Sequence, residues 1–179
     1  MLKYNGSILK LPSKAIVDYV APPVQSYMRY MWKFTGATTK DNYREFQMAC
    51  LKINDISFPY TYIASGLTYG SAWSDGVASN LIDVDETNKW GGGLSYGSGT
   101  QSGWIIFDLP SAIVPLSYSL KTANDTAEIG RNPTYAYLYA SLETPTTDTD
   151  PSWVLLDERD PELPRSNLTW CGPYILNQV

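Results

Sequence analysis

The sequence predicts an all-β sandwich, and three observations lead to that fold class. Runs of alternating side-chain character recur along the chain, as in residues 104–109 and 135–142, and a period of two is typical of strands with one buried face. Glycine, proline and asparagine separate these runs and mark turns. The sequence shows no amphipathic helix pattern longer than two turns and no internal repeat. About seven to nine short strands are expected, arranged as a sandwich or jelly roll.

The chain is expected to form one domain with a short extension. Its 179 residues are enough to bury a substantial core and too few for two comfortable domains. We expect an N-terminal arm over residues 1–26 and the sandwich over residues 27–179. In the arm, Asn5 and Gly6 predict a turn, and the pair Pro22 and Pro23 excludes a continuing helix.

The first half of the sandwich begins with two predicted strands. Residues 27–34 alternate, with Tyr30, Trp32 and Phe34 on one face. Residues 36–42 predict a turn, and residues 43–53 predict the second strand. Residues 58–79 are rich in Tyr, Ser and Gly and predict a long irregular segment, which is either functional or a cover over the sandwich.

The stretch formed by residues 80–109 organises the rest of the chain. Its first part is a turn dense in oxygen ligands, with three acidic residues and a threonine between positions 83 and 87. Six glycines between positions 91 and 103 predict a loop, because glycine permits positive φ and costs too much entropy inside a regular element. Residues 104–109 then alternate and predict a strand that is buried on at least one side.

The second half predicts further strands at residues 114–123, 135–142 and 153–157, with a last one near residues 174–176. Residues 124–133 predict a polar connection between the first two.

Aromatic residues are abundant, with 14 tyrosines and 6 tryptophans, and they favour both strands and surfaces that stack on flat ligands. Tyr135, Tyr137 and Tyr139 share one side of their strand, which is more typical of a sheet face or protein interface than of a sugar platform. Three tryptophans are expected in the core: Trp90, Trp104 and Trp153.

Charge and composition exclude several classes of protein. A net charge of −5, a pI near 4.6 and scattered basic residues argue against nucleic acid and against an anionic membrane surface. The absence of histidine excludes Ser-His-Asp and Cys-His catalysis and histidine zinc sites. The glycine-rich stretch lacks the Gly-Lys-Ser/Thr ending of a phosphate loop. We therefore expect a protein that is not an enzyme.

Cys50 and Cys171 lie far apart in the sequence, and two buried free thiols are favoured over a single disulfide. No apolar run has the length of a signal peptide or a membrane span. We expect the protein to stay in the compartment where it is made, or to leave by lysis or within an assembly, without inserting into a membrane.

Four motifs carry a resemblance to a known family. They read NLIDVDETNKW, GWIIFDL, SYSLKTANDTAEIGRNPTYAYLYAS and SWVLLDER, and they occur in that order over nearly half of the chain. The set resembles the galactose-binding-like, or discoidin-like, jelly roll of carbohydrate-binding modules and adhesins. Strands that close the domain in the family resemble residues 27–37 and 43–55, which here precede the central motif. This order looks like a circular permutation, which a sandwich tolerates when its termini lie close together.

The resemblance implies a structural Ca²⁺ beside the acidic turn. Carried over by motif, its ligands are Glu45, Asp83, Asp85 and Thr87, with backbone carbonyls completing the oxygen shell. Alternatively, Asp83 caps the turn while Asp85 and Glu86 are solvated.

A sugar site needs a flat apolar surface together with groups that hydrogen-bond hydroxyls. The loop residues that offer these are Tyr69, Trp73, Tyr96, Arg131 and Asn132. The alternatives are loop packing for Trp73 and Tyr96, and an ion pair between Asp125 and Arg131 that locks the turn between them.

Together these expectations describe a non-catalytic carbohydrate-binding protein that attaches to host or environmental glycans. Permuted modules of this kind resemble those of phage structural proteins, so we expect a virion component assembled in the host cytoplasm, multivalent or homo-oligomeric, whose arm contacts other virion proteins. Many copies would amplify weak single-site binding. The alternative is a structural capsid-decoration or tail-assembly protein that uses the sandwich for protein contacts. An accessory module of a carbohydrate-active enzyme is a third possibility, weakened because no catalytic region accompanies it.

Overall fold

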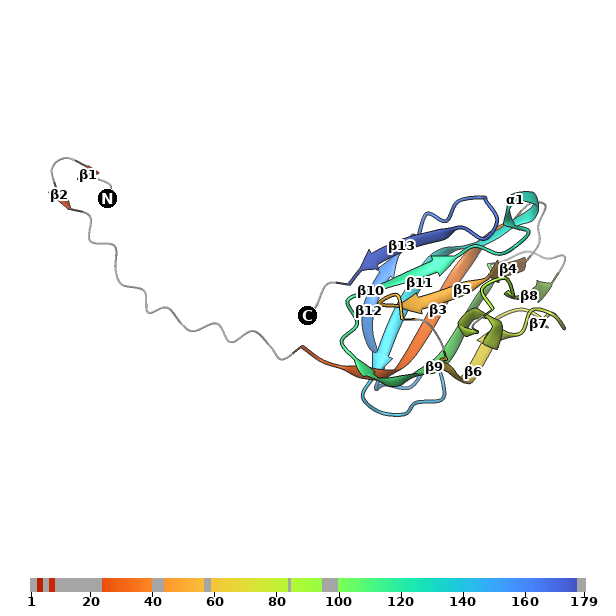
Figure 1. Ribbon diagram of the computed structural model, residues 1–179, viewed down its shortest axis with the longest axis horizontal. Helices are drawn as coiled ribbons and strands as arrows, with labels where there is room; N and C mark the ends of the chain where they lie inside the picture. The colour runs from red at the N-terminus through yellow and green to blue at the C-terminus, as the bar shows by residue number, and fades with distance from the viewer. Residues whose placement is uncertain are drawn as a thin grey trace.

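The structure is a computed structural model that describes residues 3–4, 7–8, 24–39, 44–56, 59–83, 85–94 and 100–176. It is an all-β sandwich, as predicted (Figure 1). The elements are β1 (Lys3–Tyr4), β2 (Ser7–Ile8), β3 (Tyr27–Thr39), β4 (Arg44–Met48), β5 (Cys50–Ile53), β6 (Thr61–Leu67), β7 (Ser71–Ala72), η1 (Ala78–Ile82), β8 (Trp90–Leu94), β9 (Ser102–Ile113), β10 (Ser117–Lys121), α1 (Thr126–Ile129), β11 (Gly130–Ser141), β12 (Val154–Arg159) and β13 (Trp170–Ile175).

Two layers form the sandwich. One is a five-stranded sheet in the order β12-β11-β3-β9-β6, and the other consists of two three-stranded sheets, β13-β10-β5 and β4-β8-β7. In Figure 1, β13, β10 and β5 lie in front of the strands of the larger sheet. Within the predicted arm, β1 pairs with β2 in antiparallel register. Asn5 and Gly6, predicted to form a turn, lie outside the described residues.

Aromatic rings join the two layers. Phe34 of β3 lies with its ring centre 4.0 Å from that of Phe46 on β4, and Phe46 lies 4.6 Å from Trp90 on β8. These rings and that of Trp32 are almost completely buried, and burying one such side chain stabilises the fold by about 1.5–3 kcal/mol. The prediction that Trp90 lies in the core is confirmed.

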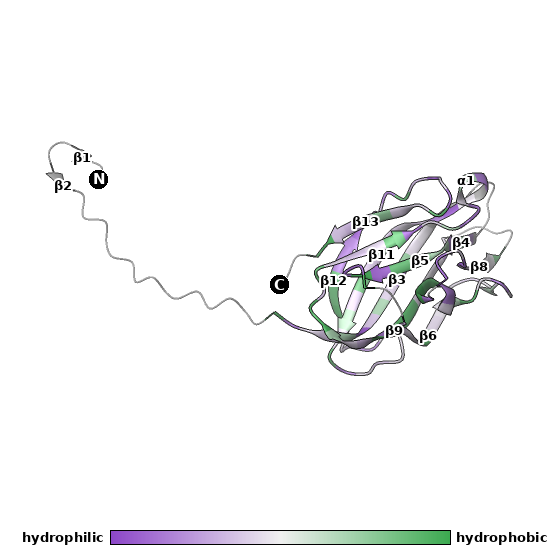
Figure 2. Ribbon diagram, in the orientation of Figure 1, coloured by the Kyte–Doolittle hydropathy of each residue, from purple (hydrophilic) through white to green (hydrophobic). Residues whose placement is uncertain are grey.

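Most of the predicted strands are present. Ile105, Phe107 and Leu109 of β9 are buried on one face, as the alternation predicted. On β11 the alanines and the leucine are buried while the tyrosines stay partly exposed. Figure 2 shows hydrophobic residues along both strands. The strand expected near residues 174–176 is β13, which begins four residues earlier.

The single strand predicted for residues 43–53 is two strands. The chain leaves one sheet and joins another at Ala49, whose N–H donates to the Lys121 carbonyl at 2.9 Å. The predicted turn at residues 36–42 is also wrong for residues 36–39, which continue β3. Gly36 makes this continuation possible with a φ of 75°.

Residues 58–79 are not one irregular segment, because they contain β6, β7 and the start of η1. β6 is an edge strand, and from Ile63 to Leu67 every residue is half-buried. A strand partly covered on both faces shows no alternation, so the period-two signal was missing.

The glycine-rich stretch contains strand β8, contrary to the predicted loop. A Cβ atom on Gly92 would lie 2.5 Å from the Ser71 carbonyl oxygen and 2.8 Å from the Cα of Ala72. Strand β7 can therefore approach β8 this closely only beside a glycine, and that close contact outweighs the entropic cost. Gly97 and Gly99 lie outside the described residues.

Both cysteines are free, as favoured by their spacing. Cys50 is completely buried, and burial raises the pKa of its thiol to about 12. Cys171 is only half-buried. A thiol with so high a pKa is protonated at neutral pH and unreactive.

We expect Gly92→Ala to destabilise the protein by about 1–3 kcal/mol, because the added methyl group meets backbone atoms that cannot rotate away. The control is Leu94→Ala in the same strand, where the side chain is 43% exposed, with an expected change of at most about 0.5 kcal/mol. Urea denaturation measures both. Equal stabilities of the two variants would show that β7 can move away from β8.

Candidate functional site

Three of the predicted site residues meet where β4, β7 and the start of β11 come together. The guanidinium carbon of Arg131 lies 5.0 Å from the centre of the Trp73 ring, and its Nη2 lies 2.6 Å from Oε2 of Glu45. The Glu45 side chain is only 4% exposed, and a buried carboxylate requires a partner of opposite charge. Arg131 has a φ of 71°, which is costly for a residue other than glycine. The ion pair and the ring contact offset that cost.

A second cation lies over the same ring. Lys89 Nζ is 5.6 Å from the centre of Trp73 and donates to Oδ2 of Asp125 at 2.8 Å. The predicted ion pair between Asp125 and Arg131 is therefore wrong, because each residue pairs with a different partner. Contacts with two cations hold Trp73 in place and agree with the loop-packing interpretation of this residue.

Two buried polar atoms of this cluster are not hydrogen-bonded to any described residue. Within the described part of the chain, the buried Nε of Arg131 and Oδ1 of Asp125 make no hydrogen bond. Because buried polar groups are normally satisfied, an ordered water molecule or a ligand hydroxyl could bind them.

The other residues predicted to bind sugar lie apart from one another, and one of them lies outside the described residues. The Tyr69 backbone donates to Gln101 Oε1 at 3.1 Å and accepts from its Nε2 at 3.0 Å, so a buried amide fixes the loop while the Tyr69 side chain stays half-buried. Asn132 is 3% exposed, and its Nδ2 donates to two backbone carbonyls in the segment before β13. Tyr96 lies outside the described residues. A buried Asn132 shapes the loop and does not face a soluble sugar.

The four residues implied as calcium ligands do not converge. Oδ1 of Asp85 accepts from the hydroxyl of Thr87 at 2.5 Å and from its N–H at 2.9 Å, and these bonds, the hydroxyl first, lower the pKa of Asp85. Asp83 follows η1 directly, while Glu45 is engaged by Arg131. Among the described residues no group of three or more Asp, Glu, Cys or His side chains could hold a metal ion. The residues present therefore do not fit the implied calcium shell.

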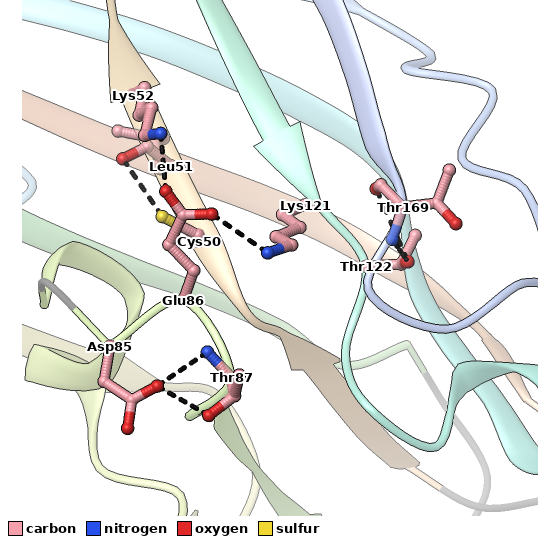
Figure 3. A network of polar contacts seen from close by, with 9 residues as sticks. All are labelled: Cys50, Leu51, Lys52, Asp85, Glu86, Thr87, Lys121, Thr122 and Thr169. Carbon is pink, nitrogen blue, oxygen red and sulfur yellow. Dashed lines mark hydrogen bonds and ion pairs between the residues drawn. The ribbon is translucent and has the colours of Figure 1, made fainter. Parts of the chain in front are cut away.

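Glu86 instead holds the acidic turn against the sheet β13-β10-β5 (Figure 3). Its two carboxylate oxygens accept from Lys52 Nζ at 2.6 Å and from Lys121 Nζ at 3.0 Å. Both ammonium groups also lie over the ring of Trp170, at 4.5 and 5.5 Å. The lysine hydrogen bonds lower the pKa of Glu86. Glu86 is thus an ion-pair partner and not the solvated residue of the alternative interpretation.

A row of aromatic and charged side chains crosses the outer face of the five-stranded sheet. In register, Glu158 lies opposite Tyr137, Tyr137 opposite Lys33, and Lys33 opposite Trp104. Directly opposite residues of antiparallel strands point to the same side. The other two tyrosines of β11 have ring centres 5.3 and 6.4 Å from that of Tyr137. We call this surface the aromatic face, and it consists of Tyr135, Tyr137, Tyr139, Trp104, Lys33 and Glu158.

The structure corrects the assignment of Trp104 and Trp153 to the core, since both are half-buried. The Trp104 ring covers Gly66 of the neighbouring strand, where a Cβ would lie 2.9 Å from ring atoms. Trp153 Nε1 donates to the Thr147 carbonyl at 2.8 Å. The alternation of residues 104–109 already placed Trp104 opposite the buried Ile105, so the signal was present in the sequence.

The loop between β11 and β12 borders the aromatic face. Arg29 Nη1 donates to the Pro145 carbonyl at 3.0 Å, and Lys33 Nζ pairs with Asp148 at 3.1 Å. Met31 lies between these two anchors on β3 and is 1% exposed. The loop therefore covers part of the outer face and leaves the tyrosines beside it half-exposed.

Comparison of the chain with protein-family models, with curated proteins and with solved structures found no match. The discoidin-like resemblance thus stays a prediction from the motifs. In the described part of the chain, neither helical element has the length and apolar character needed to span a bilayer.

Calcium is expected to leave the thermal stability unchanged, because Glu45 is paired with Arg131 and one carboxylate oxygen of Asp85 accepts two hydrogen bonds from Thr87. Melting temperatures of metal-free protein, measured with chelator and with excess calcium, should coincide. A bound ion at a hundredfold over its Kd would add about 2.7 kcal/mol and raise the melting temperature by about 5–10 °C. Such a rise, reversed by chelator, would show a calcium site built from other ligands.

Glu86→Gln is expected to lower stability by about 1 kcal/mol at pH 7, since both lysines lose their charged partner. The lowered pKa means that this stabilisation is present above the ordinary value of 4.5 and is lost as the pH falls through the folded-state value. Denaturation between pH 3 and pH 7 should therefore show a weaker acid dependence in the variant. Glu143→Gln, at an exposed position, is the control, and identical pH profiles of the two variants would contradict the role of Glu86.

Proposed function

We propose that the protein is a non-catalytic attachment protein that binds glycans through the aromatic face. The observation that supports this most directly is the row formed by Glu158, Tyr137, Lys33 and Trp104. Tyrosine and tryptophan rings offer apolar planes to a pyranose, while a carboxylate and an ammonium group hydrogen-bond its hydroxyls. All four side chains are at least partly exposed.

This proposal moves the sugar site from the loops to the sheet. The half-buried Trp73 and Arg131 are engaged by Lys89 and Glu45, and Asn132 is buried. The aromatic face has a matching chemistry and remains half-exposed, although Lys33 pairs with Asp148 at its border and the Tyr135 hydroxyl bonds to Glu158. The setting on a phage particle rests on the resemblance of the motifs alone.

A second candidate function is attachment to another protein within an assembly. Tyr137 contacts the tyrosines on both sides of it, and clustered tyrosines and tryptophans are enriched in protein interfaces. The Tyr135 hydroxyl donates to Glu158 at 3.4 Å, and burial, followed by the charge of that carboxylate, raises its pKa. The Tyr135 phenol therefore stays protonated at neutral pH and can donate a hydrogen bond to a glycan or to another protein.

Tyr137→Ala is expected to reduce glycan binding about fivefold or more, because one stacking ring contributes about 1 kcal/mol or more. The measurement is a glycan array probed with protein presented multivalently. Trp73→Ala tests the loop site in parallel, and Tyr62→Ala, at a 43% exposed tyrosine on β6, is the control.

Binding that is lost only in Tyr137→Ala would support the aromatic face. Binding lost only in Trp73→Ala would return the site to the loops. An array on which the wild-type protein binds no glycan would overturn the glycan proposal and favour the protein-contact candidate.

A further inference from the structure

Strand β12 forms one edge of the five-stranded sheet. An edge strand presents backbone N–H and C=O groups that can pair with another strand. Val154 and Leu155 of this strand are 47% and 44% exposed. Register places Ala140 opposite both Val154 and Tyr30, so the exposed Met28 and Leu142 lie at the same end of the sheet. Exposed apolar side chains therefore lie around the start of β12.

The edge is also held firmly in place. Asp157 of β12 accepts from the buried Tyr118 hydroxyl at 2.9 Å and pairs with Arg159. The Arg159 guanidinium lies 4.9 Å from the Tyr174 ring centre. These contacts fix the inner face of β12 against the sheet β13-β10-β5. The outer edge of β12 is therefore a preformed template for another strand.

A segment suited to that template precedes the sandwich. Residues 15–20 read AIVDYV, a run rich in β-branched residues and closed by aromatic and apolar side chains, which favours a strand. Its six residues match the length of β12. This segment lies outside the described residues.

Charge favours the same pairing. Residues 1–23 contain three lysines and one aspartate, a formal charge of +2, which leaves −7 on the remaining 156 residues. Lys10 and Lys14 precede the six-residue run, while Glu158, Asp160 and Glu162 lie at the far end of β12. Opposite charges of this kind steer two surfaces together.

The direction of the chain favours pairing between two copies. Strands β3 and β12 are parallel to each other, because each is antiparallel to β11. An antiparallel strand on its own β12 edge would have to reverse direction between residues 20 and 27. Residues 24–26 contain no turn, and the residue before each of Pro22 and Pro23 is biased toward extended backbone. After a parallel strand, residues 21–26 would have to run back along the whole length of the sheet to the start of β3. Six residues span at most about 20 Å, which is too short for this return.

We propose that residues 15–20 of one copy add as a strand to the β12 edge of a second copy of this chain. The contact is heterologous, so it joins copies head to tail and forms a ring or a filament. It does not depend on the proposed glycan function.

Two full-length variants test this proposal. Val17→Pro removes a strand N–H from the added segment, and Leu155→Lys places a charge on the edge. Light scattering coupled to size-exclusion chromatography should show that the wild-type mass rises with concentration up to about 0.1 mM, while each variant stays monomeric. Ser13→Pro and Leu116→Lys, at a 56% exposed leucine of the other layer, are controls that should associate like the wild type.

Mixing the two variants gives the decisive result. Leu155→Lys still has an intact arm and Val17→Pro still has an intact edge, so the mixture should form a 1:1 dimer with a single contact and no larger species. A monomeric wild type, variants that associate normally, or a mixture that stays monomeric would each overturn the proposal. Because mass is the readout, failure here is distinct from an array without bound glycans.

Discussion

The contact between Phe34 and Phe46 is the interaction on which the rest of the sandwich depends. Phe34 belongs to the central strand of the larger sheet and Phe46 to the facing layer, so their rings, 4.0 Å apart between centres, join the two layers. Trp90 packs against both and brings β8 to this position. The glycines that follow Trp90 then let β7 and Trp73 approach, which completes the sheet β4-β8-β7. One aromatic cluster thus determines where the charged groups around Trp73 can lie.

The sequence revealed the strands whose two faces differ and missed those whose faces are alike. β9 and β11 bury one side and expose the other, so their alternation was visible. β6 is half-buried on both sides and β8 is mainly glycine, so neither carries the pattern. The glycines were interpreted from their intrinsic conformational cost, whereas their close neighbours in space come from another strand. Information of that kind depends on the fold and is not present in a local window of sequence.

The candidate ligands illustrate the same limit. Glu45 and Arg131 are 86 positions apart in the numbering, and Glu86 reaches lysines of two other strands. An acidic or basic residue in a loop has the same appearance in the sequence whether it binds a ligand or an opposite charge within the fold. The predicted pair of Asp125 with Arg131 assumed that opposite charges at the two ends of one polar connection pair with each other. The fold instead brought Arg131 to Glu45 on β4 and Asp125 to Lys89, which directly precedes β8.

The aromatic face and the β12 edge adjoin, and this has a physical consequence for binding. Leu155 of the edge lies opposite Tyr139 of the face, so a strand added at β12 would continue the same surface. Single sugar contacts of half-exposed rings are weak, and a second contact gains affinity only when the linkage holds both sites within reach. A head-to-tail contact at the border of the proposed binding surface would meet that condition, since each copy would carry its aromatic face at a fixed orientation to the next. Affinity could then increase with the number of copies and without any new contact to the glycan.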